Sequence, residues 1–129
     1  MKELNKDIET RDRIIYGRYR PNKYRGGTSS FRDMNVKTLR KLLEQNFIDP
    51  EETQNESPTV EQIYEFMQRH PEYTCHGYTV AADRADYRVS IEGVEKGGPA
   101  ANPIEFKDFM DLFGGADEIN YRTNYCWFD

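Results

Sequence analysis

The residues best suited to chemistry in this chain are two histidines and two cysteines. His70 ends a predicted helix just before Pro71, where an imidazolium is favoured by the helix dipole and the last carbonyls. His76 follows Cys75 in a predicted strand, and neighbouring strand residues point to opposite faces, so these two cannot ligate one ion. Cys126 and His76 make a nucleophile and base only if their strands lie side by side. We therefore expect structural roles for all four.

Other catalytic and cofactor signatures are missing from the sequence. No C-x-x-C or H-x-x-x-H spacing supplies the three or four ligands that zinc needs. No serine lies in a G-x-S-x-G elbow, and the Gly-Gly pairs lack the lysine of a P-loop. The carboxylates show no spacing that selects a catalytic pair. We expect no metal, no cofactor and no enzyme, with a small hydrolase using carboxylates or Cys126 and His76 as an alternative.

A basic, tyrosine-rich segment near the N-terminus is the best indication of a binding function. Cationic and aromatic side chains interleave between residues 16 and 25 and end in a single Arg-Gly-Gly. Cations neutralise phosphates and aromatic rings stack on bases, so this composition suits single-stranded nucleic acid. The candidate residues, for nucleic acid or another partner, are Tyr16, Arg18, Tyr19, Arg20, Lys23, Tyr24 and Arg25.

The charge of the chain is divided between its two parts. Residues 1–41 hold 12 Lys and Arg against 5 Asp and Glu, a net charge of +7. Residues 42–129 hold 6 against 18, a net charge of −12, and the two give the −5 of the whole chain. The basic segment can therefore lie on the acidic body of the same molecule or of a second copy. An acidic body also suits a basic surface on another protein, because electrostatic steering speeds that encounter.

The elements that must position these residues can be read from the hydrophobic pattern. Apolar residues recur at helical spacing in 36–47, 60–67 and 104–113. Apolar and polar residues alternate in 73–82 and 86–94, which predicts a hairpin. The predicted caps and breaks of the helices are Asn35, Pro71, Asn102 and Gly114, and the second helix is predicted to start near residues 57–59.

Two terminal segments complete the interpretation. Residues 119–128 are rich in β-branched and aromatic side chains, which predicts a third strand. Residues 1–13 predict a weakly helical end, and Pro and Gly break regular structure in 14–30. We therefore predict an α+β fold with three helices packed on a small three-stranded, mainly antiparallel sheet. A basic arm spans 1–34 and an acidic domain spans 35–129.

Composition and the terminal sequence set the expected compartment and function. The first residues hold no apolar core of a signal peptide, and no run reaches the ~18 residues of a membrane span. We expect a cytoplasmic protein with both thiols reduced and at least half-buried. Its expected function is that of a non-catalytic interaction or regulatory module acting through charged surfaces on a protein, itself or another chain. Single-stranded nucleic-acid binding through the basic arm is the alternative.

Overall fold

The computed structural model describes residues 3–18, 27–97 and 100–129, which form an α+β fold as predicted. Its helices are α1 (Ile8–Tyr16), α2 (Val36–Glu44), α3 (Val60–Arg69) and α4 (Pro103–Phe113). Its strands are β1 (Thr28–Met34), β2 (Tyr73–Val80), β3 (Val89–Lys96), β4 (Glu118–Asn120) and β5 (Tyr125–Trp127). The described residues thus contain four helices where the sequence pattern predicted three. In this part of the chain, no helix has both the length and the apolar character to cross a bilayer.

The main sheet has the strand order β1–β2–β3 and is antiparallel throughout. The predicted hairpin of β2 and β3 is confirmed, with an irregularity between His76 and Gly77. The third strand is β1, in which Thr28 lies opposite Val80. Residues 28–34 therefore belong to the sheet, although the sequence analysis assigned them to the arm. The Thr-Ser-Ser run at the start of β1 has the composition of a loop. The apolar side chains through which this strand packs into the core come only after that run.

The prediction of one long strand over 119–128 is wrong, because the chain turns back in the middle of it. β4 and β5 form a separate two-stranded sheet. Asn120 Oδ1 accepts a hydrogen bond from the backbone N–H of Arg122 at 3.0 Å, and Asn124 has a φ of 44°. Asparagine favours both arrangements, so it forms a turn here despite the strand propensity of its neighbours.

The helices α2 and α4 begin at their predicted caps, and α3 begins in the predicted region around residues 57–59. Asn35 accepts from the N–H of the third helical residue of α2. Thr59 forms a capping box with Gln62 at the start of α3, and Asn102 precedes Pro103 in α4. These caps satisfy backbone donors that a helix leaves unpaired at its start. They fix where each helix begins relative to the sheet.

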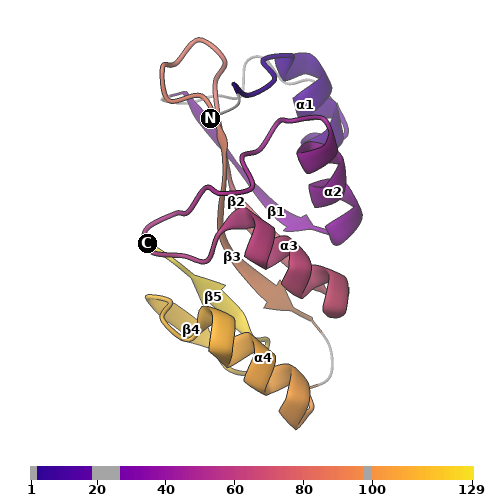
Figure 1. The fold of residues 1–129 in the computed structure, drawn as a ribbon, viewed down its shortest axis with the longest axis vertical. Coiled ribbons are helices and arrows are strands. Elements are labelled where there is room, and N and C mark those ends of the chain that lie inside the picture. The colour runs from indigo at the N-terminus through magenta and orange to yellow at the C-terminus, as the bar shows by residue number, and fades with distance from the viewer. Residues whose placement is uncertain (1–2, 19–26, 98–99) are drawn as a thin grey trace.

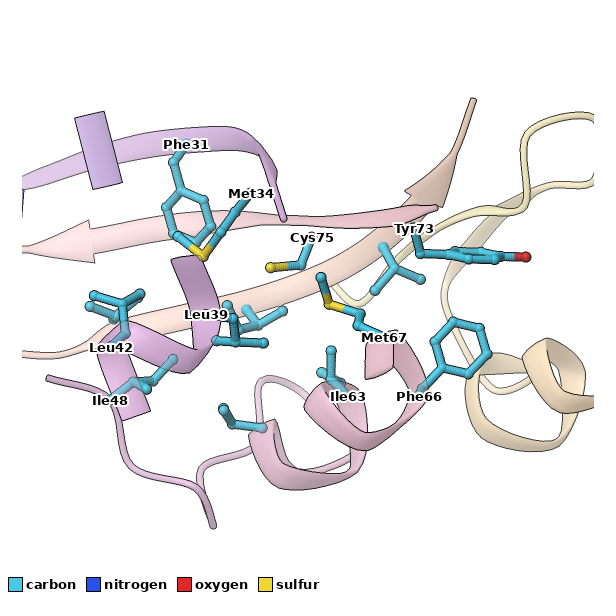
Figure 2. Close-up of a cluster of buried hydrophobic side chains, with 14 of the residues drawn as sticks. Phe31, Met34, Leu39, Leu42, Ile48, Ile63, Phe66, Met67, Tyr73 and Cys75 are labelled. Carbon is cyan, nitrogen blue, oxygen red and sulfur yellow. The ribbon is translucent and has the colours of Figure 1, made fainter. Parts of the chain in front are cut away.

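The hydrophobic core lies between the main sheet and the helices, and Figure 2 shows the sheet on one side with α2 and α3 on the other. Phe66 of α3 packs edge-on against Tyr73 of β2 and Phe113 of α4, with ring centroids 4.8 and 5.1 Å apart. Each large side chain that is fully buried stabilises the fold by about 1.5–3 kcal/mol. The core side chains labelled in Figure 2 are Phe31, Met34, Leu39, Leu42, Ile48, Ile63, Phe66, Met67, Tyr73 and Cys75.

The helix α1 lies beside α2 at one end of the molecule, whereas α4 and the β4–β5 hairpin lie at the other end (Figure 1). Two fully buried charged residues, Arg11 and Asp12, anchor α1 to the rest of the fold. Arg11 Nη2 lies 3.0 Å from Asp12 Oδ1, and Nη1 donates to the carbonyl of Val80 at 2.7 Å. The guanidinium also lies 5.1 Å from the ring centroid of Tyr87. Because its most deeply buried residues are charged, α1 shows little apolar periodicity, and hydrophobic patterning does not predict it well.

Candidate functional site

Two residues of the predicted basic binding segment are described, and they differ in their surroundings. Tyr16 is partly buried, and its hydroxyl donates to the carbonyl of Ser29 at 2.9 Å and lies 3.1 Å from Thr79 Oγ1. Tyr16 thus joins α1 to the sheet. Arg18 is exposed just after the helix. The other candidate residues lie outside the described part of the chain: Tyr19, Arg20, Lys23, Tyr24 and Arg25.

Cys126 and His76 are close in space, but not as a nucleophile and its base. The Nε2–H of His76 donates to the backbone carbonyl of Cys126 at 3.0 Å, and its ring stacks on Tyr125 with centroids 5.0 Å apart. The Cys126 thiol instead accepts from the backbone N–H of Val94, at 3.5 Å. This imidazole therefore orients the chain and does not activate the sulfur.

Both cysteines are free and fully buried, which confirms their predicted burial. Burial raises the pKa of Cys75 and of Cys126 to about 12. Because the thiolate is the reactive form, such thiols are poor nucleophiles at neutral pH. Burial is also the main reason why the pKa of His76 is lowered, which keeps that ring neutral near pH 7.

A pocket of about 580 Å³, the acidic pocket, opens between α2, the following turn and α3. Its apolar wall includes Leu43 and Tyr64, while carboxylates of Asp49, Glu51 and Glu61 lie around it. It is lined by Leu4, Leu43, Asn46, Asp49, Pro50, Glu51, Glu61 and Tyr64.

Local hydrogen bonds place the carboxylates of the acidic pocket together. Asp49 accepts from the backbone N–H of Glu51 at 2.9 Å, which shapes the turn after α2. The backbone N–H of Glu61 donates to the carbonyl of Pro50 at 2.9 Å, so the start of α3 is held against this turn. Among the described residues, none of these three carboxylates forms an ion pair. Their negative charge is therefore available to a ligand.

A second group of side chains, the His70 cluster, lies at the other end of α3. It consists of His70, Glu72 and Glu105, which offer ligand atoms within 4.8 Å of one another. His70 is the C-cap of α3, Glu72 precedes β2, and Glu105 lies in the first turn of α4. All three line a pocket of about 560 Å³ that is completed by Asn102, Pro103 and Ile104.

Neighbouring groups fix two members of the His70 cluster. The Nε2 of His70 lies 2.9 Å from Asp108 Oδ2. Glu105 is buried, and it accepts from Lys96 Nζ at 2.7 and 2.8 Å and from the Tyr73 hydroxyl at 3.0 Å. Burial raises the pKa of Glu105, but the hydrogen bonds from Lys96 and Tyr73 outweigh it and leave that pKa below its usual value. Glu105 is therefore an ionised, oriented carboxylate.

Sequence reasoning placed His70 at the helix end but missed the cluster. Glu105 lies far along the chain, and only the docking of α4 against the end of α3 brings it to His70. The pair His70 and Glu72, two positions apart after a helix, was the one local signal.

Comparisons of this chain with known protein families, with curated proteins and with solved structures find no match.

Proposed function

We propose that the protein is a non-catalytic interaction module that binds a basic segment of another protein in the acidic pocket. The observation that carries this proposal is the combination of an apolar wall with three carboxylates that form no ion pair in the described part of the chain. Pockets that bind ligands commonly combine apolar surface with a few polar groups that fix orientation. The expected ligand therefore has an apolar side chain flanked by lysine or arginine.

The charges around the pocket favour a cationic partner. Asp49, Glu51 and Glu61 repel one another, and a bound ammonium or guanidinium relieves that repulsion. The whole region 42–129 has a net charge of −12. This charge attracts basic surfaces and disfavours the approach of a partner through an acidic surface. Arg40 does not line the pocket, but its Nε donates to the hydroxyl of the lining residue Tyr64 at 2.8 Å. This bond holds the aromatic ring that lines the pocket.

The same charges make nucleic acid a weaker candidate than a basic protein. An acidic body repels phosphates, and the hydroxyl of Tyr16 is already engaged inside the fold. The buried Cys126 thiol, with its raised pKa, likewise gives little support to a hydrolase. A basic segment of a protein is therefore the partner that these charges favour.

The proposal is tested by titrating the protein with a short peptide in which two leucines are flanked by lysines. Isothermal titration calorimetry should detect binding that weakens as the salt concentration rises, because the attraction is screened. The double variant Glu51→Gln with Glu61→Gln should bind about tenfold more weakly, equivalent to about 1.4 kcal/mol. A peptide with glutamates in place of the lysines should not bind.

The matched control is Glu118→Gln, which removes one negative charge from an exposed residue of β4 that does not line this pocket. It should bind the lysine peptide as the unchanged protein does. Equal weakening by Glu61→Gln and Glu118→Gln would mean that net charge alone attracts the peptide. That result, or the absence of any binding, would refute the acidic pocket as the docking site.

A further inference from the structure

We infer that His70, Glu72 and Glu105 form a binding site for a divalent transition-metal ion of the Zn²⁺ or Mn²⁺ class. This site is separate from the acidic pocket and does not depend on the proposed function. Its three ligand atoms lie within 4.8 Å of one another. In tetrahedral geometry, zinc bonds to nitrogen and oxygen of about 2.0–2.2 Å place neighbouring ligand atoms roughly 3.3–3.6 Å apart. Binding therefore requires the ligand atoms to move closer together, and the exposed Glu72 side chain has space for such a movement.

The orientation of His70 is the first reason for this assignment. Its Nε2 lies 2.9 Å from Asp108 Oδ2, so this carboxylate engages Nε2, and Nδ1 is the ring nitrogen left for a metal ion. Within the described residues, Nδ1 has no hydrogen-bond partner. Metal-binding histidines in proteins commonly donate their other N–H to a carboxylate in this way, which fixes the tautomer and raises the basicity of the ligand. Asp108 is thus a positioning residue for His70.

The balance of charge is the second reason. The carboxylates of Glu72, Glu105 and Asp108 carry three negative charges, and the ammonium of Lys96 supplies one positive charge. The carboxylates therefore outnumber the single ammonium, and this excess of negative charge favours a bound cation. The ligand atoms of Glu72 and Glu105 also lie within 4.8 Å of each other. Two carboxylates at such a distance favour a proton or a cation between them.

The bonds of Glu105 determine how it can bind the ion. Lys96 contacts both of its oxygens and the Tyr73 hydroxyl contacts one. Each carboxylate oxygen has two lone pairs, so one oxygen can still bind a metal while these contacts hold the group in place. One imidazole and two carboxylates suit zinc or manganese, whereas calcium and magnesium prefer oxygen ligands alone. The surrounding pocket of about 560 Å³ has room for water on the remaining coordination positions.

The test begins with protein stripped of metal by a chelator and then titrated with Zn²⁺. Isothermal titration calorimetry should show one site, and the midpoint of thermal unfolding should rise because the ion binds the folded state. The variant Glu72→Gln should lose most of this binding. Glu72 is exposed, so the variant is expected to fold normally, which circular dichroism can verify. The variant Asp108→Asn should weaken binding by about 10- to 100-fold, as expected for a group that orients a ligand.

The two histidines of the chain provide an internal control. Zinc should shift the imidazole ¹⁵N resonances of His70, whereas those of His76, which is held by a carbonyl and a stacked ring, should not change. The variant Glu118→Gln should bind zinc as the unchanged protein does. A shift at His76, equal affinity of Glu72→Gln and Glu118→Gln, or no binding at all would overturn the assignment.

Discussion

The α1 anchor and the acidic pocket hold charge in opposite ways. At the anchor, Arg11 and Asp12 are fully buried, paired with each other and bonded to the sheet. At the pocket, Glu51 and Glu61 are exposed and form no ion pair within the described residues. Buried charges need partners inside the protein, whereas exposed ones are already hydrated. The first arrangement therefore maintains the fold, and the second is suited to recognition.

The largest effect on stability is expected for the variant Arg11→Met, which tests the role of the buried pair. Removing the guanidinium takes away the cation that lies 3.0 Å from the fully buried Asp12 carboxylate, so the free energy of unfolding should fall by about 3–5 kcal/mol. Urea denaturation measures this loss. The double variant Arg11→Met with Asp12→Leu should recover part of it, because no uncompensated charge is then buried. A loss below about 1 kcal/mol would mean that the pair is not part of the fold's support.

A smaller effect on stability is expected from Glu52, which is partly buried beside the exposed Glu51. Burial is the main cause of the raised pKa of Glu52, which hydrogen bonding from Ser90 and the charge of Arg88 only partly offset. Between pH 4.5 and the raised pKa, the folded state binds more protons than the unfolded state. Stability contributed by Glu52 should therefore decrease as the pH rises through this window. Calorimetric unfolding from pH 4 to pH 7 should show this decrease in the unchanged protein but not in Glu52→Gln, with Glu51→Gln as the control.

The smallest effect is expected on the stability of the pocket variants. Glu51→Gln and Glu61→Gln should each change the free energy of unfolding by no more than about 0.5 kcal/mol, because both residues are exposed and neither carboxylate forms an ion pair in the described fold. Chemical denaturation at neutral pH is sufficient to measure this. If either change destabilises the protein by more than 1 kcal/mol, the distinction between supporting and recognising charges does not hold there.

Local signals in the sequence were sufficient for most of the fold. Asn35, Thr59 and Asn102 cap helices because their side chains replace a missing backbone acceptor, and this effect acts within one turn. The apolar alternation of β2 and β3 is equally local. What these signals missed depends on distant contacts. Arg11 is buried only because β2 offers it a carbonyl, and hydrophobic periodicity treats an arginine as exposed.

The candidate sites were harder to predict than the fold. The excess of acidic residues was evident, but the pocket exists because Leu4, Leu43 and Glu61 come together from three separate segments. The His70 cluster likewise needs α4 to dock before Glu105 reaches the end of α3. A rule based on short ligand spacing cannot detect either arrangement, because spacing along the chain says nothing about segments that meet only in the folded state.

The position of β1 has a consequence for the order in which the sheet is assembled. Thr28 pairs with Val80, 52 positions later, whereas Thr79 pairs with Val89, only 10 positions later. Closing a longer loop costs more chain entropy, and distant pairings slow folding. The β2–β3 hairpin therefore has the shorter loop to close. The segment between β1 and β2 contains α2 and α3, and it must fold back on itself before β1 can pair with β2. We therefore expect β1, the first of the described strands to be synthesised, to be the last to join the sheet.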